Sequence, residues 1–346
     1  MLPTRGLGKT GLNVTALGFG GAGIGNLYRA VSEEAARASI DAAFGAGARL
    51  FDTAPFYGFG LSEQRIGAAL RDLDPDETII LSTKVGRVLE SAPDDDVTLL
   101  REGYLTPMPV RPVFDYSYDG VMRSYLESLK RLRRGRIDIL LAHDLGAATH
   151  KERHDHYFRQ FITGGYRAMR ELRDGGAVKA IGLGVNEWEV CEQALDHGDF
   201  DCFLLAGRYT LLEQTALDSF LPRCAARGVS LVIGGPYNSG ILATGVKGKG
   251  PLNYNYEPAP PDIVDRVRRI ESVCDRFAVP LAAAAMQFPL AHPQVTAVIP
   301  GMVNAAEAQA AKANLERAIP AEFWDALRRD GLLHPAAPTP YKRGKR

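Results

Sequence analysis

The sequence has no excess of charge of either sign and no long apolar run. Its 41 lysine and arginine residues equal its 41 aspartate and glutamate residues, so no overall field attracts nucleic acid or an anionic membrane. No stretch is long enough to cross a bilayer, and the first residues contain no apolar core of signal-peptide length. We therefore expect a cytoplasmic protein that acts on a small molecule, while its oligomeric state cannot be predicted.

Cysteine is also scarce, and its spacing excludes two further classes. Cys191, Cys202, Cys224 and Cys274 lie far apart without a C-x-x-C pair, so we predict neither a disulfide framework nor a zinc site. The histidine-rich stretch HDLGAATHKERHDHY matches no common zinc spacing and is interpreted as a solvated loop. We predict no metal site in this chain.

What is present is a regular alternation of apolar runs and amphipathic stretches, which indicates strands and helices in turn. The expected strands are VTALGFGG, RLFDTA, IILSTKVG, IDILLAHD, VKAIGLGV, DCFLLAGR, VSLVIGG and VTAVIPG. A helix is expected after each strand, with an extra helix near residues 321–330. Eight such units over 346 residues predict an α/β fold, a (β/α)8 TIM barrel.

Three segments lie outside this repeat. Residues 4–14 contain turn residues between β-prone pieces and predict a hairpin that closes the barrel floor. Residues 88–117 and 237–261 are too long for ordinary connections and leave the carboxyl ends of strands, so we expect lids over a site. We expect one domain over residues 1–335 and a basic C-terminal tail over residues 336–346.

The stretch LGFGGAGIG contains G-x-G-x-x-G at Gly18, Gly20 and Gly23. In a Rossmann unit the third glycine lies in the helix that receives the pyrophosphate, and the sheet has about six strands. Here NLYRAV separates the glycines from Ser32, the expected helix cap, and the repeat continues to an eighth unit. We interpret the glycines as a loop on the barrel rim where a cofactor can approach the backbone closely.

Three consecutive strands end in ionisable residues, namely Asp52, Lys84 and His143. A buried lysine needs a carboxylate partner, so we expect an Asp52–Lys84 pair, which by itself is equally consistent with a structural role. Tyr57 lies five residues past Asp52, and a nearby ammonium is expected to lower its pKa and make it a general acid or base. His143 would orient the substrate, and Phe56 is expected to line the substrate pocket.

The chain resembles the aldo-keto reductase superfamily over nearly its whole length. The motifs that carry the resemblance are, in order, GARLFDTAPFYGFGLSE, TKVG, LLAHD, GAVKAIGLGVNEWE and VIPG. The resemblance implies a barrel that binds NAD(P) along its carboxyl-end rim without a Rossmann domain. It places the catalytic tetrad on Asp52, Tyr57, Lys84 and His143, with hydride passing between nicotinamide and substrate while Tyr57 moves the proton.

The resemblance also implies cofactor contacts along the rim. They fall on Gly20, Gly21, Ala22, Asp52, Asn186, Pro236, Asn238, Gly240, Ile299, Gly301 and Met302. Asn186 matches an asparagine that holds the nicotinamide amide, although Val185 stands where a serine is usual. Gly234 stands where an aromatic residue often stacks on the nicotinamide, so that face is absent or supplied by another residue.

The choice between NAD and NADP depends on the residues after VIPG. The segment MVNAAEA has no basic residue to hold a 2'-phosphate, and a phosphate without a cation loses a charge-assisted interaction. We therefore expect NAD rather than NADP. The family's adenine-binding Glu-Asn pair falls on Ala310 and Ala311, and Lys312 could still compensate.

Within the superfamily, GNLYRAVSEEAA, FDTAPFYGFGLSE and AHDLGAATH resemble the branch of L-fucose and D-threo-aldose 1-dehydrogenases and pyridoxal 4-dehydrogenase. The resemblance implies oxidation of a sugar hemiacetal to a lactone, with pyridoxal oxidation or general aldehyde and ketone reduction as alternatives. An NAD(P)-binding regulatory subunit is disfavoured by the complete tetrad. A hydrolase or lyase would pair Asp52 with a second acid, for which the neighbouring strand ends offer only Asp144.

Overall fold

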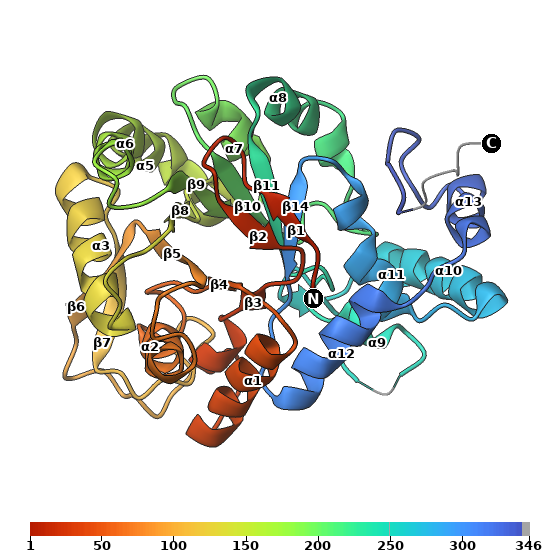
Figure 1. Ribbon diagram of the computed structural model, residues 1–346, viewed down its shortest axis with the longest axis horizontal. Helices are drawn as coiled ribbons and strands as arrows, with labels where there is room; N and C mark the ends of the chain where they lie inside the picture. Colours follow the sequence, from red (N-terminus) through yellow and green to blue (C-terminus); the bar gives the residue numbers. More distant parts are fainter. Residues whose placement is uncertain (249, 341–346) are drawn as a thin grey trace.

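The computed structural model describes residues 1–248 and 250–340, and within them eight parallel strands form a barrel (Figure 1). In chain order, which is also the order of pairing, they are β3 (Phe19–Gly20), β4 (Leu50–Asp52), β5 (Ile80–Val85), β8 (Ile139–His143), β9 (Ala180–Val185), β10 (Cys202–Ala206), β11 (Ser230–Gly234) and β14 (Val295–Ile299). Bridges join Leu17 to Val298 and Gly20 to Gly301, and they close the sheet between β3 and β14. The predicted (β/α)8 barrel is confirmed.

Helices surround the barrel, so its strands are buried on both faces and consist mostly of apolar residues. The longer ones are α1 (Glu33–Gly45), α2 (Leu61–Leu73), α3 (Tyr118–Leu132), α6 (Tyr166–Asp174), α7 (Glu189–Ala194), α8 (Phe220–Arg227), α10 (Pro261–Phe277), α11 (Leu281–Gln287), α12 (Ala305–Glu316) and α13 (Ala321–Arg329). Ser32 caps α1 as predicted, because its Oγ accepts a hydrogen bond from the amide of Ala35. No helix within the described residues is both long and apolar enough to span a membrane.

Sequence reasoning missed helical structure in residues 147–165. This stretch forms α4 (Ala147–His150), α5 (His154–Gln160) and a π-helical turn (Phe161–Gly165) that runs into α6. Its histidines interrupted the apolar pattern, yet His150, Tyr157 and Phe158 are buried. The histidine-rich stretch is therefore helical and not the expected loop: His150, Tyr157 and Phe158 pack inward, while residues 151–153, 155 and 156 are exposed to solvent.

The N-terminal hairpin of β1 (Thr4–Gly6) and β2 (Asn13–Thr15) closes one end of the barrel, as predicted. Leu7 and Val14 are fully buried among side chains of the barrel interior. The expected strand VTALGFGG is divided, because Val14 and Thr15 belong to β2 of the hairpin and only its later residues join the barrel. The opposite end of the barrel is left open for a site.

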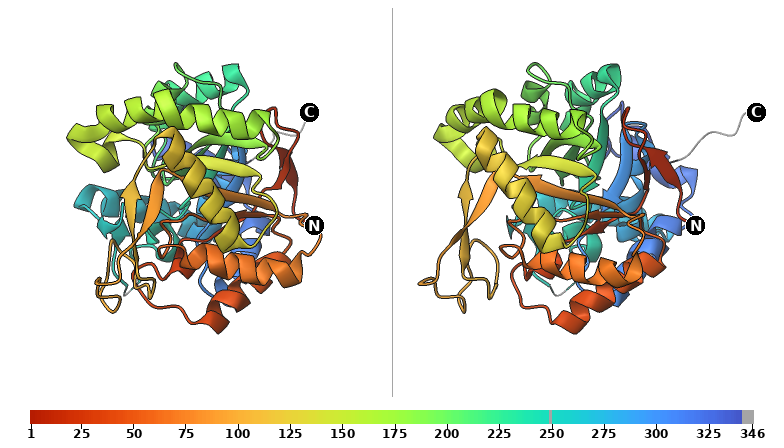
Figure 2. Two further views of the ribbon diagram at one scale, coloured as in Figure 1. Left: turned by 90° about the vertical axis from the view of Figure 1, so that its left-hand side faces the viewer. Right: turned by 60° about the vertical axis from the view of Figure 1, so that its left-hand side comes forward.

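Both long segments fold at that opposite end (Figure 2). The first forms the hairpin of β6 (Arg87–Ser91) and β7 (Val110–Phe114), and Arg101 fixes its tip by donating hydrogen bonds to the carbonyls of Thr106, Met108 and Val110. The second contains α9 (Ile241–Thr244), β12 (Asn253–Tyr254) and β13 (Glu257–Pro258). The hydrogen bonds of Arg101 give the first segment a defined shape, and the pairing of β12 with β13 does the same for the second.

The chain after α13 folds back on the barrel. His334 donates its amide hydrogen to Gln214 Oε1, and the carbonyl of Ala337 accepts a hydrogen bond from Arg328. Ala337, inside the predicted tail, is buried. The basic residues of that tail, 341–346, lie outside the described residues.

Candidate active site

Asp52, Lys84 and His143 lie at the carboxyl ends of β4, β5 and β8, which are neighbours in the barrel. The Lys84 ammonium donates hydrogen bonds to Asp52 Oδ2 at 2.7 Å and to the carbonyl of Thr53 at 2.9 Å. Ser82 donates to the other carboxylate oxygen of Asp52 at 2.8 Å. The predicted Asp52–Lys84 pair is confirmed, and both of its members are buried.

Tyr57 lies over this pair with its ring toward the lysine. Lys84 Nζ is 4.5 Å from the centroid of the Tyr57 ring, so the ammonium faces the aromatic ring. Burial raises the pKa of Tyr57 well above its ordinary value, and the charge of Asp52 adds to the effect. The expectation that Lys84 lowers this pKa is wrong, because the lysine charge is already balanced by Asp52. At neutral pH Tyr57 is therefore a proton donor.

His143 is a neutral imidazole at the same rim. Burial lowers the pKa of His143 to about 3, although Asp144 opposes the shift. Its Nδ1 atom is buried and has no hydrogen-bond partner among the described residues. The ring lies edge-on to Tyr57 and Phe56, with centroid distances of 5.6 and 5.9 Å. A neutral histidine here can donate one hydrogen bond to the oxygen of a ligand without adding charge.

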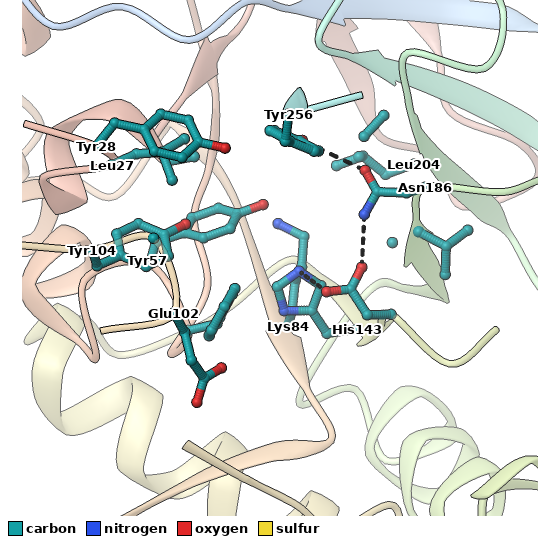
Figure 3. Close-up of a pocket in the computed structure, with 17 residues that line it drawn as sticks. Leu27, Tyr28, Tyr57, Lys84, Glu102, Tyr104, His143, Asn186, Leu204 and Tyr256 are labelled. Carbon is teal, nitrogen blue, oxygen red and sulfur yellow. Dashed lines mark hydrogen bonds and ion pairs between the residues drawn. The ribbon is translucent and has the colours of Figure 1, made fainter. Parts of the chain in front are cut away.

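Two cavities meet at Tyr57. The smaller one, called the pocket, has a volume of about 230 Å³ and contains Phe56, Lys84 and His143 among its walls (Figure 3). The larger one, called the groove, has a volume of about 640 Å³ and includes Asp52. The residues that line both cavities are Ala22, Leu27, Tyr57, Leu204, Ala206 and Tyr256. The phenol of Tyr57 can thus reach ligands in both.

Most of the expected cofactor contacts line the groove. They are Gly20, Gly21, Ala22, Asp52, Pro236, Gly240, Ile299, Gly301 and Met302. Asn238 does not line it, because its side chain is buried and binds Thr210 and the carbonyl of Gly207. Asn186 lines the pocket instead, where its amide donates to Asp144 Oδ1 at 3.0 Å.

The groove suits an extended ligand that approaches the backbone. A Cβ atom added at Gly240 or Gly301 would meet no atom within 4 Å, so a side chain there would occupy the groove itself. Gly234 lines the groove without an aromatic ring, and Tyr237 and Tyr256 from the following segment bring aromatic faces to it. These features fit the dinucleotide that the sequence resemblance implies.

The charges in the groove are sparse. Among the described lining residues Arg29 is the one cation, and its Nη2 lies 3.8 Å from Glu307 Oε1. Ala310 and Ala311 also line the groove. Lys312 is absent from these lining residues and pairs with Glu316 one turn along α12. In this structure Lys312 therefore adds no charge to the walls of the groove.

Several pocket residues were not selected from the sequence. Figure 3 shows two of them, Tyr28 and Tyr104, on the side of Tyr57. The other additions are Leu27, Glu102, Asp144 and Tyr256. Only Asp144, the acid directly after His143, had a signal in the sequence.

No group of three or more histidine, cysteine or acidic residues suited to a metal ion occurs in residues 1–248 and 250–340. His150, one of the clustered histidines, shares a hydrogen bond of 3.0 Å with the Tyr116 hydroxyl. Burial lowers the pKa of His150 to about 4. This histidine is a neutral core residue.

A (β/α)8 barrel that brings a phenol, a lysine, a carboxylate and an imidazole to the junction of two cavities defines a barrel oxidoreductase. Residues 16–329 match the model of the aldo/keto reductase family, and the chain belongs to that family. Aldo/keto reductases use NAD(P)H. The predicted superfamily is confirmed.

The chain is similar to named dehydrogenases over almost all of its length. It is 44% identical over 337 residues to pyridoxal 4-dehydrogenase of Microbacterium luteolum, covering 95% of this chain and 97% of that protein. It is 39% identical over 334 residues to D-threo-aldose 1-dehydrogenase of Pseudomonas sp, with the same coverage. The solved structure of aldo-keto reductase AKR11C1 from Bacillus halodurans, holo form, has a TM-score of 0.73 at 25% identity and 99% coverage of both chains. The chain is therefore an oxidoreductase of the branch that the sequence resembled.

Proposed function

We propose that this enzyme is an NAD-dependent dehydrogenase that oxidises an aldose such as L-fucose or D-threo-aldose at C1, converting the cyclic hemiacetal to a lactone. The observation that carries the proposal is the position of Tyr57, which lines both the pocket and the groove above the Asp52–Lys84 pair. A hemiacetal carbon in the pocket would lie beside the groove, and its hydroxyl would lie within reach of the phenol.

In this mechanism Tyr57 moves the proton. His143 donates a hydrogen bond to the oxygen on the reacting carbon, and its neutrality avoids stabilising that oxygen as an anion too early. Tyr57 accepts the hydroxyl proton during oxidation and returns it during reduction. Asp52 holds Lys84 against the Tyr57 ring, so the buried ion pair fixes the position of the phenol between the pocket and the groove.

A nicotinamide coenzyme held along the groove supplies the hydride acceptor. Gly301, where an added Cβ would meet no protein atom, would let the coenzyme approach the backbone closely. Tyr237 and Tyr256 offer stacking faces in place of the aromatic residue that is absent at Gly234. We propose NAD over NADP, because Glu307 disfavours a 2'-phosphate and holds the one nearby cation, Arg29.

The relatives and the pocket walls also support a second candidate, pyridoxal. Pyridoxal forms an internal cyclic hemiacetal, so the same proton and hydride transfers would convert it to a lactone. The rings of Tyr28, Phe56, Tyr104 and Tyr256 line the pocket and suit a flat aromatic substrate as well as the C–H face of a sugar. The greater identity is with the pyridoxal enzyme, and the polar groups of the pocket favour a sugar.

The test is the initial rate of NADH and NADPH formation with L-fucose, D-arabinose, L-galactose and pyridoxal. Oxidation of one or more sugars with NAD+ supports the proposal. Turnover of pyridoxal alone would replace the substrate assignment and leave the chemistry intact. Cofactor binding without turnover of any substrate would favour a regulatory subunit and overturn the dehydrogenase proposal.

A further inference from the structure

Asp144 has an unusual position directly after His143. Successive residues of a strand point to opposite faces, yet both of these side chains line the pocket. The backbone of Asp144 has φ = 49°, the left-handed region that residues other than glycine rarely occupy. This turn at the end of β8 brings the Asp144 carboxylate beside His143.

The Asp144 carboxylate accepts hydrogen bonds from two partners, has His143 Nε2 at 3.6 Å from Oδ2, and keeps free acceptor positions. Oδ2 accepts a hydrogen bond from Arg87 Nη2 at 2.6 Å, and Oδ1 accepts one from the amide of Asn186 at 3.0 Å. An ionised carboxylate has about four acceptor positions, so about two remain. Because Asp144 lines the pocket, those positions are available to a ligand there.

Arg87 keeps this carboxylate charged and in place. Its guanidinium lies between the rings of Phe56 and Phe114, at 3.8 and 4.5 Å from their centroids, and it is 93% buried. Burial opposes ionisation of Asp144, but the charges around it, those of Arg87 and Lys84 among them, hold its pKa below the usual value. A charged acceptor therefore stands in the pocket at neutral pH.

The position of Asp144 matches one particular group of a sugar. In the proposed function His143 binds the oxygen on the reacting carbon, and Asp144 Oδ2 lies 3.6 Å from His143 Nε2. The next acceptor along the chain thus suits a hydroxyl on the neighbouring carbon. The aromatic walls recognise shape but cannot distinguish a hydroxyl from a hydrogen at that carbon, whereas a buried carboxylate can.

Resting on the proposed function, we propose that Asp144 is a specificity-determining residue that accepts a hydrogen bond from the substrate hydroxyl next to the oxidised carbon. Arg87 is the positioning residue that holds Asp144. The enzyme then selects aldoses that carry the hydroxyl at C2 and discriminates against their 2-deoxy forms.

The test compares kcat/KM for L-fucose and 2-deoxy-L-fucose in the wild type, in Asp144→Asn and in a control. Asparagine adopts left-handed backbone easily, so the substitution removes charge while keeping the turn. The matched control is Glu90→Gln, which neutralises an exposed acid of β6 outside the pocket. We expect Asp144→Asn to lose about tenfold to hundredfold on L-fucose, because a hydrogen bond to a charged group is lost, and less than threefold on the 2-deoxy sugar.

Equal losses of kcat/KM on both sugars in Asp144→Asn would overturn the inference, as would a wild type that oxidises both sugars equally well.

The positioning role of Arg87 is tested separately with Arg87→Met. Without the cation the pKa of Asp144 rises, so the preference for the C2 hydroxyl should weaken at low pH and return at high pH. A loss that is the same for both sugars at every pH would assign Arg87 a structural role only.

A binding experiment separates this inference from the proposed function. 1,5-Anhydro-L-fucitol lacks the anomeric hydroxyl and cannot be oxidised, but it keeps the C2 hydroxyl. Calorimetric titration of the NADH-saturated protein should give a tenfold or greater loss of affinity in Asp144→Asn. This result with no sugar turnover would refute the dehydrogenase proposal while supporting Asp144. Equal affinity in both proteins would refute the role of Asp144 alone.

Discussion

Replacing Tyr57 by phenylalanine removes one oxygen atom from the junction of the pocket and the groove. The Tyr57 hydroxyl forms no hydrogen bond with any described residue, so its loss leaves no protein group unpaired. The ring contacts with His143 and Tyr104 are kept. We therefore expect the free energy of unfolding to change by less than about 0.5 kcal/mol.

The catalytic loss should be much larger. Positioned proton transfer contributes about 10² to 10⁴ in rate, which corresponds to about 2.7 to 5.4 kcal/mol of transition-state stabilisation. Lys84→Met is the informative contrast, because it leaves Asp52 buried without its partner. Breaking a buried ion pair costs about 3 to 5 kcal/mol. With an unfolding entropy of about 2.1 cal/mol/K per residue, 346 residues give a fall in Tm of about 4 to 7 °C.

The assay measures kcat with the best sugar and the Tm of each protein by calorimetry. Tyr57→Phe should lose at least a hundredfold in kcat with Tm unchanged within about 1 °C, whereas Lys84→Met should lose both activity and stability. Retention of more than a tenth of the wild-type rate by Tyr57→Phe would refute the assignment of proton transfer to Tyr57. Measuring the rates at several cofactor concentrations separates a loss of kcat from weaker cofactor binding.

Three further predictions concern pH and the groove. Because burial raises the pKa of Tyr57, kcat/KM for oxidation should rise with pH from 6 to 9, while kcat/KM for reduction should stay constant over the neutral range. A plateau in kcat/KM for oxidation below pH 8 would contradict this. Gly301→Val should place its side chain in the groove and weaken NADH binding at least tenfold by fluorescence titration with Tm unchanged, and unaltered affinity would place the dinucleotide elsewhere. Wild type should bind NADH more tightly than NADPH. Glu307→Gln should reduce the ratio of the NADPH to the NADH dissociation constant by about tenfold, because Arg29 is released and a repelling charge is lost. An unchanged ratio would show that Glu307 does not determine the choice of cofactor.

The barrel and the charged rim could be predicted because both depend on local sequence. Each strand is an apolar run of a few residues, and the rim charges of Asp52, Lys84 and His143 follow directly from where those runs end. The rest of the pocket comes from turns whose backbone the sequence does not reveal. Asp144 and Tyr256 have φ of 49° and 67°; aspartate is one of the residues that tolerate this region, whereas tyrosine rarely occupies it.

Electrostatic behaviour was the least predictable part of the site, as Tyr57 shows. Proximity to Lys84 suggested a lowered pKa, but the effect of a cation depends on what already balances its charge. Asp52 neutralises Lys84, and burial then dominates and raises the pKa of Tyr57. Similarly, the composition of HDLGAATHKERHDHY suggested solvent, whereas the fold buries His150 against Tyr116.

The paired charges of the rim explain why proton transfer should control the direction of the reaction. Lys84 is paired with Asp52, and Arg87 is paired with Asp144 and lies 3.5 Å from Glu102, so neither cation is free to stabilise a ligand anion. His143 is neutral and Tyr57 is protonated at neutral pH. The resting site therefore holds the proton that reduction consumes, and oxidation must first release that phenolic proton. Proton release to solvent thus belongs to the oxidative cycle, and raising the pH drives it.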